Sequence, residues 1–197
     1  MPKFNCQRDF ALNKRDTDMK HKQLYEFRDT DGAGNPEVVM SRFDEGNSDL
    51  SNPNSRITLY STNDNWTYDA SSPTNDADGD GDHDEEDASY YLAAANLMTA
   101  MATLSPRDES KRLYDRILMG FSDSPATDVS ILHYRKGNRD LNRPDVIVVA
   151  SNPDYLGSYR TIKGALDADG DGDIDSDDER IYKKLASTFA SMKYLKP

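Results

Sequence analysis

The chain has 197 residues, a formal net charge of −12 and 36% apolar residues, a length that suits one ordinary domain or two small ones. It holds no apolar run long enough to span a bilayer and no basic stripe typical of nucleic-acid binding. Cys6 is the single cysteine, which excludes a disulfide-stapled fold.

The first half of the chain predicts a helix, two strands and a metal-binding loop in that order. Its first residues lack the apolar stretch of a secretory signal, so we expect no Sec export. Residues 22–26 belong to a segment that we expect to be helical. Strands are predicted at 37–43 and 56–61, and in the latter apolar and polar residues alternate. Residues 44–54 are rich in Asn, Asp, Gly and Pro, which suits a long hairpin loop.

An aspartate-rich loop follows at residues 76–87. It has carboxylates at loop positions 1, 3, 5, 9 and 12 and glycine at position 6, the spacing with which an EF-hand loop surrounds calcium. Calcium takes about six to eight oxygen ligands, so a short loop must turn its carboxylates inward. Position 7 supplies its backbone carbonyl in this scheme. The predicted ligands are Asp76, Asp78, Asp80, Asp82, Asp84 and Asp87.

The second half repeats this order after an apolar helix predicted at 90–104. Ser105-Pro106 resembles a helix start, and the apolar residues from Leu113 to Phe121 follow a helical period. Strands are predicted at 129–134 and 146–150, the latter apolar throughout and so expected to be buried on both faces. A second loop at 167–178 has the calcium spacing again. Its predicted ligands are Asp167, Asp169, Asp171, Asp173, Asp175 and Asp178.

The two halves are a tandem duplication with an offset of 91 residues. The offset relates Gly46 to Gly137, and upstream residues 22–26 resemble 111–115, which requires a two-residue length difference. We expect an α+β fold of two pseudo-symmetric repeats, each a helix, a β-hairpin, a calcium loop and a helix. Residues 1–106 would form the first repeat with an N-terminal extension and 107–197 the second, packed as one unit.

The negative charge belongs to the two loops. They hold eight and seven of the 36 acids, so the rest of the chain has 21 acids against 24 Lys and Arg. Blocks of like charge are often solvated and disordered, but the fixed order of aspartate and glycine in two copies favours metal binding. We therefore predict two calcium ions as cofactors.

The loops and the helices that follow them resemble the calcium-binding repeats of dockerin domains. In each of the two copies, no long helix enters the loop, and loop position 12 is aspartate. The shorter run Asp29–Glu37 resembles the calcium loops of FG-GAP-type repeats, with Ala33 in place of one ligand, and a plain turn is the alternative reading.

We expect a structural or assembly protein rather than an enzyme. The chain shows no nucleophile elbow, phosphate-binding glycine loop or zinc spacing, and its histidines and cysteine have no catalytic spacing. Two calcium ions would lock the fold or an interface with protein subunits of a larger assembly, such as a virion or cell-surface component, and a cytoplasmic location is the alternative. We expect no catalytic role for His21, His83, His133 or Cys6.

Two other functions remain open from the sequence. A calcium buffer or sensor would expose a methionine-rich groove, and Met98, Met101 and Met192 lie on the predicted exit helices. A carbohydrate- or matrix-binding module would use aromatic residues in the connections. Those aromatic residues are Trp66, Tyr68, Tyr155 and Tyr159.

Overall fold

The computed structural model describes residues 19–30, 32, 36–63, 65, 67–72, 84–102, 113–122 and 127–192. The first half of the chain contains β1 (Met19–Arg28), β2 (Glu37–Phe43), β3 (Ser55–Tyr60), β4 (Ala70–Ser72) and α1 (Glu85–Ala102). The second half contains β5 (Tyr114–Ser122), β6 (Val129–Arg135), β7 (Val146–Ser151), β8 (Thr161–Lys163) and α2 (Ser176–Met192).

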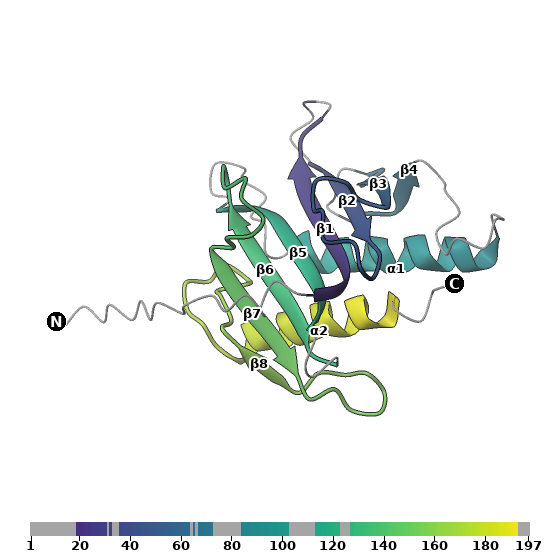
Figure 1. Ribbon diagram of the computed structural model, residues 1–197. Coiled ribbons are helices and arrows are strands. Elements are labelled where there is room, and N and C mark those ends of the chain that lie inside the picture. Colours follow the sequence, from purple (N-terminus) through teal and green to yellow (C-terminus); the bar gives the residue numbers. More distant parts are fainter. Residues whose placement is uncertain are drawn as a thin grey trace.

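The strands in these residues form one antiparallel sheet of eight, in the order β4-β3-β2-β1-β5-β6-β7-β8 (Figure 1). Each half therefore contributes four consecutive strands, and the halves meet where β1 pairs with β5. The two helices lie against each other on one face of the sheet and run in opposite directions. None of the described helices is long and apolar enough to cross a membrane.

The predicted α+β class, with a helix opening each repeat, is wrong, because the structure is mostly β. Residues 22–26 lie in β1 and the apolar stretch up to Phe121 lies in β5, at the centre of the sheet. In β5, Ile117 packs in the core on the helix side while Leu118 packs on the opposite face. A strand buried on both faces is a continuous apolar run, and periodicity cannot distinguish it from a buried helix. The predicted helix start at 105–109 lies outside the described residues.

The strand register corrects the alignment of the two repeats. Val38 and Val129 are equivalent, and their partners on the adjoining strands are Phe27 and Phe121. β1 and β5 are therefore related by an offset of 94, not by the predicted 89. Phe27 and Val38 are 11 positions apart and Phe121 and Val129 are 8 apart, so the first repeat is three residues longer between these equivalent positions, and the predicted difference had the opposite sign.

The remaining strand predictions agree with the structure to within a residue at each end. Residues 37–43 coincide with β2, and the predictions at 56–61, 129–134 and 146–150 fall on β3, β6 and β7. β7 is not buried on both faces as expected, because Ile147 and Val149 are half-buried. β4 and β8, three residues each, had not been predicted.

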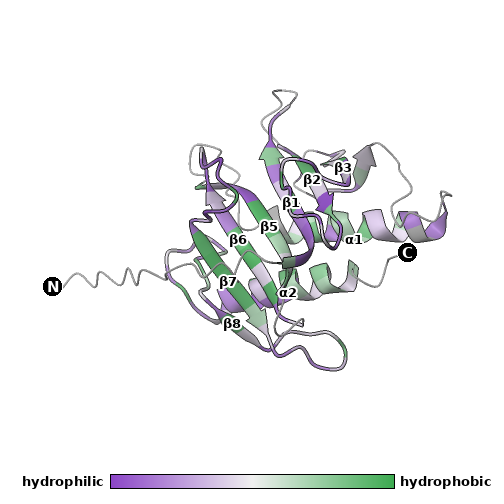
Figure 2. Cartoon of the chain, in the orientation of Figure 1, coloured by the Kyte–Doolittle hydropathy of each residue, from purple (hydrophilic) through white to green (hydrophobic). Residues whose placement is uncertain are grey.

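Two apolar clusters cover the two faces of the sheet. The cluster on the helix side joins both helices to all the central strands, and Figure 2 shows the apolar stretches of β5 and β7 that contribute to it. The cluster on the other face is smaller, and Leu50 and Leu141 from the two long hairpin loops pack against it. Its buried members are Met19, Leu24, Phe43, Leu118, Leu132 and Tyr134.

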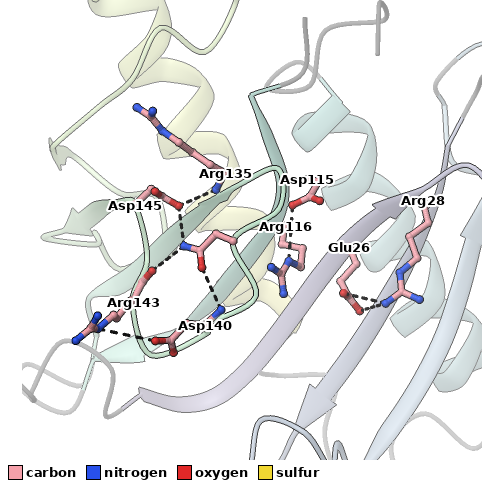
Figure 3. A network of polar contacts seen from close by, with 9 residues as sticks. Glu26, Arg28, Asp115, Arg116, Arg135, Asp140, Arg143 and Asp145 are labelled. Carbon is pink, nitrogen blue, oxygen red and sulfur yellow. Dashed lines mark hydrogen bonds and ion pairs between the residues drawn. The ribbon is translucent and has the colours of Figure 1, made fainter. Parts of the chain in front are cut away.

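The hairpin loops after β2 and β6 are held by the same hydrogen bonds. The Asn47 side-chain amide donates to Asn52 O (2.9 Å) and Asn54 Oδ1 (2.7 Å), and its Oδ1 accepts from Asp49 N (3.0 Å). Figure 3 shows the second loop with Asp140, Arg143 and Asp145. The equivalent bonds of Asn138 join Arg143 O (2.9 Å), Asp145 Oδ2 (2.8 Å) and Asp140 N (3.0 Å). The duplication therefore extends to individual side-chain contacts.

Candidate metal centre

The aspartate loop at 167–178 connects β8 to the start of α2. Asp167 shapes its first half, because its two carboxylate oxygens accept from Gly170 N (2.7 Å) and Gly172 N (3.0 Å). Gly170 and Gly172 have φ of 80° and 103°, in the left-handed region that a β-carbon disfavours. Gly172 occupies loop position 6, where the sequence predicts a sharp turn.

The last two acids of the loop cap the helix. Asp175 precedes α2, and its Oδ1 accepts from Asp177 N at 2.7 Å. Asp178 in the first turn reaches back, and its Oδ2 accepts from Asp175 N at 2.7 Å. Asp178 thus makes the side-chain half of a capping box, with aspartate in place of the usual glutamate, while Asp175 caps the amide of Asp177. Both residues were predicted as calcium ligands, and this second role was not predicted.

Asp178 is also the buried anchor of the loop. Its side chain is 1% exposed, and its Oδ1 accepts from Ala168 N, so it ties the loop's beginning to the helix. Burial raises the pKa of Asp178, but hydrogen bonds from the backbone of Ala168, Asp175 and Asp169 together outweigh it and hold the pKa below its ordinary value. Asp178 is therefore ionised at neutral pH.

The exposed acids repel one another. The charge of Asp171 is the main cause that raises the pKa of Asp173, with further contributions from burial and from Asp175 and Asp178. For Asp169, a hydrogen bond from Asp171 N lowers the pKa, but partial burial and the neighbouring charges together raise it above its ordinary value. A cation held in the loop would relieve this repulsion.

The loop brings its six predicted ligands together in two groups of three. One carboxylate oxygen from each member of a group lies within 4.8 Å of the others. Calcium–oxygen distances of about 2.3–2.6 Å separate two ligands of one ion by up to about 5 Å, so the three oxygens of either group are close enough to be ligands of a single ion. The groups are Asp167, Asp169, Asp171 and Asp173, Asp175, Asp178.

The donor chemistry indicates which cations fit. The side chains that the loop brings to ligand distance are all carboxylates, which suit hard ions such as calcium, magnesium and manganese rather than soft ones. The structure groups the Asp173 carboxylate with those of Asp175 and Asp178, whereas the sequence assigned its backbone carbonyl to the metal. Within the described residues, groups of three or more acids close enough to share an ion occur in this loop only.

The first loop is described only at its end. Asp84 N donates to Asp87 Oδ2 at 3.1 Å, and Asp87 is buried, which repeats the arrangement of Asp175 and Asp178. The other predicted ligands of this loop lie outside the described residues. They are Asp76, Asp78, Asp80 and Asp82.

The described residues of the run from Asp29 to Glu37 are linked by side-chain hydrogen bonds just before and at the start of β2. Gly32 N donates to Asp29 Oδ1 at 2.7 Å, and Glu37 Oε2 accepts from Thr30 N (2.7 Å) and Oγ1 (2.6 Å). Asp31 and residues 33–35 lie outside the described residues. Among the described residues, Glu37 therefore holds Thr30 close to the start of β2.

A buried polar pair lies one helical turn after Asp178. Tyr182 Oη is 3.3 Å from His133 Nε2, and both side chains are buried between α2 and β6. Burial lowers the pKa of His133 to about 4, so it is neutral near pH 7. His133 thus has the structural setting that its strand predicts. His21 lies in β1 instead of a helix, with Nε2 3.8 Å from Glu45 Oε2, and His83 and Cys6 lie outside the described residues.

Comparison of the chain with family models, with curated proteins and with solved structures found no match.

Proposed function

We propose that this protein is a calcium-binding structural module in which one ion in each repeat stabilises the fold. The observation that carries the proposal is the duplicated aspartate loop. In its second copy, just before and at the start of α2, six aspartates form two groups whose carboxylate oxygens are close enough to bind an ion together. A structural role follows from its connections, because an ion bound there would join the end of β8 to the helix that covers the sheet.

Calcium would increase stability by reducing the electrostatic repulsion between the aspartates of the loop. Folding brings the acids together at an electrostatic cost, and a bound ion offsets that cost in the folded state only. The free energy of unfolding would then rise with calcium concentration. A component of a larger protein assembly, such as a virion or a surface structure, is the setting that we propose for a module stabilised in this way.

The buried methionines favour this role over a calcium sensor. Met98 and Met192 are 0% and 3% exposed and belong to the core between the helices and the sheet. A sensor would present them on an opening groove, whereas here they hold the helices to the strands.

The tyrosines disfavour a carbohydrate platform in the same way. Tyr68 and Tyr159 are buried, and their hydroxyls donate to Pro36 O (3.0 Å) and Thr127 O (2.8 Å). Two of the four aromatic residues considered for sugar binding are thus core residues, and Trp66 lies outside the described residues.

A thermal melt with calcium or with a chelator tests the proposal. At calcium a hundredfold above Kd, one site adds about 2.7 kcal/mol to the free energy of unfolding. For a chain of this size, that raises Tm by roughly 5–10 °C. Isothermal titration should give two calcium ions per chain. Equal melting curves in calcium and in chelator would overturn the proposal.

Asp171→Asn provides the matched variant. Asparagine keeps the oxygen that accepts from Asp173 N (3.1 Å) but removes one charge from the cation site. In chelator we expect a slightly higher Tm, because the repulsion between Asp171 and Asp173 is relieved, and in calcium a smaller rise in Tm than that of the wild-type chain. Asp80→Asn, at the equivalent position of the first loop, should have the same effect if both loops bind calcium.

A further inference from the structure

The second aspartate loop enters its cation site along the core of the protein. Its second residue, Ala168, is 1% exposed and belongs to the apolar cluster on the helix side of the sheet, whereas Asp167 and Asp169 on either side of it are exposed. Ala165 and Leu166, just before the loop, pack against the same cluster. The contacts that hold residues 165–168 therefore decide where the first ligands of the loop lie.

Two side chains of α2 face this entrance. Asp178 and Tyr182 are four residues apart and so lie on the same face of the helix. Asp178 Oδ1 accepts from Ala168 N. Burial raises the pKa of Tyr182, and the backbone amide of Leu166 acts in the opposite direction, because this amide lies next to the hydroxyl. One helix face thus meets two backbone amides at the entrance of the loop.

The sheet fixes the hydroxyl of Tyr182. Tyr182 Oη is 3.3 Å from His133 Nε2, and the two rings meet edge to face with their centroids 5.8 Å apart. His133 lies in β6, which is inside the sheet between β5 and β7 (Figure 1). Its Nδ1 is buried without a hydrogen-bond partner, so Nε2 is the atom through which the imidazole is held. The hydroxyl cannot turn away from the loop without leaving the imidazole bare in the core.

We infer that Tyr182 is a positioning residue for the cation site of the second loop. Its hydroxyl, held by His133, keeps the entrance of the loop where Asp167 and Asp169 can bind an ion. Tyr182 does not touch the ion in this scheme. It keeps the loop in its binding conformation before the ion arrives, so that ordering the loop is not a cost of binding. The inference rests on the proposed function, because it assigns a role in that same site.

The size of the effect follows from the fraction of molecules in the binding conformation. The apparent Kd rises in proportion as this fraction falls. Tyr182→Phe keeps the ring in the core and removes the hydroxyl alone. The loss of one hydrogen bond changes a conformational equilibrium by about fivefold, so we expect this variant to raise the Kd for calcium about fivefold.

Calcium titration of the full chain tests the inference. All chains compared carry Asp76→Asn and Asp80→Asn, which remove two predicted ligands of the first loop, so that the titration reports the second loop. Tyr159→Phe is the matched control. Tyr159 is also buried, its backbone amide donates to the side chain of a residue in α2, and its hydroxyl donates to Thr127 O (2.8 Å) at the opposite end of β6 from the tyrosine–histidine pair. Both phenylalanine variants should lower Tm in chelator, but only Tyr182→Phe should raise the Kd.

Amide hydrogen exchange in chelator provides a readout that needs no metal. The amides of Leu166 and Ala168 should exchange faster in Tyr182→Phe than in the parent chain, because the helix face that meets them has lost its fixed hydroxyl. In Tyr159→Phe these two amides should exchange as in the parent chain.

The two readouts separate this inference from the proposed function. If the parent chain binds calcium and Tyr182→Phe has the same Kd, or if both variants raise the Kd equally, the inference is overturned and the proposed function stands. If the parent chain binds no calcium, the proposed function fails. Faster exchange at Leu166 and Ala168 in Tyr182→Phe alone would then still support the positioning role, and equal exchange would overturn it as well.

Discussion

Asp178 is expected to stabilise the fold even without calcium, and Asp178→Ala in chelator tests this. The carboxylate is 1% exposed and accepts backbone hydrogen bonds at the start of the loop and at the start of α2. Alanine would leave Ala168 N without its acceptor in a buried position and would remove half of the capping box.

The magnitude follows from these contacts. A buried donor left without an acceptor costs about 1–3 kcal/mol, and the loss of a helix cap costs about 1 kcal/mol. Relief of repulsion with the neighbouring aspartates offsets part of this cost. We expect the free energy of unfolding to fall by about 2–4 kcal/mol, which lowers Tm by roughly 4–16 °C for a chain of this size.

Denaturant unfolding followed by circular dichroism measures the effect, with Asp177→Ala as the control. Asp177 is exposed in the same helical turn, and its carboxylate is 3.5 Å from Arg180 Nη2, a surface pair worth at most about 1 kcal/mol. If both variants unfold at the same denaturant concentration, Asp178 does not hold the loop to the helix and our reasoning about the capping box is wrong.

Three further predictions use the same unfolding measurement. Asn47→Ala and Asn138→Ala should each lower the free energy of unfolding by about 1–3 kcal/mol and by similar amounts, because the two side chains make equivalent hydrogen bonds. Unequal losses would show that the two hairpin loops are not equivalent. His133 has a pKa of about 4 in the folded chain and 6.5 in the unfolded chain, so its neutral form favours folding above pH 6.5. As the pH falls from 6.5 to 4, this contribution of about 3 kcal/mol to the free energy of unfolding is lost. His133→Gln should therefore flatten that part of the stability–pH profile. Gly164→Ala should lower the free energy of unfolding by at least about 1 kcal/mol more than Gly157→Ala does. Both glycines have a positive φ, but a methyl group on Gly164 would lie 2.5 Å from the backbone oxygen of Ile147. Equal losses would contradict this close contact.

The strand pattern could be read from the sequence only where one face differs from the other or where turns bound the strand. Residues 56–61 alternate between apolar and polar side chains, and the prediction fell on β3. β1 and β5 failed because both of their faces are buried, so Ile117 and Leu118 gave no alternation. The three-residue strands β4 and β8 are too short to carry a pattern, and sheet pairing alone defines them.

The spacing of the aspartates located the candidate site along the chain, but it did not predict the contacts that connect the site to the rest of the fold. The order of aspartate and glycine gave the positions of Asp167 and Gly172, because the ligand spacing is local in sequence. The helix cap at Asp175 and Asp178 had a local signal too, an acid three residues after an acid at a helix start, which the metal interpretation obscured. The contact between His133 and Tyr182 joins residues 49 positions apart, so no local pattern contains it.

The pairing of Leu24 with Leu118 has a consequence for how this molecule arose. One half by itself would leave the ten residues of β1 as an open strand with unpaired backbone groups, a ready template for a second identical half. An ancestor of half the length would then have formed a homodimer about the axis that now passes through these two leucines. Covalent fusion freed each half to diverge, and an arginine in one half, Arg42, now stands where the other has His133.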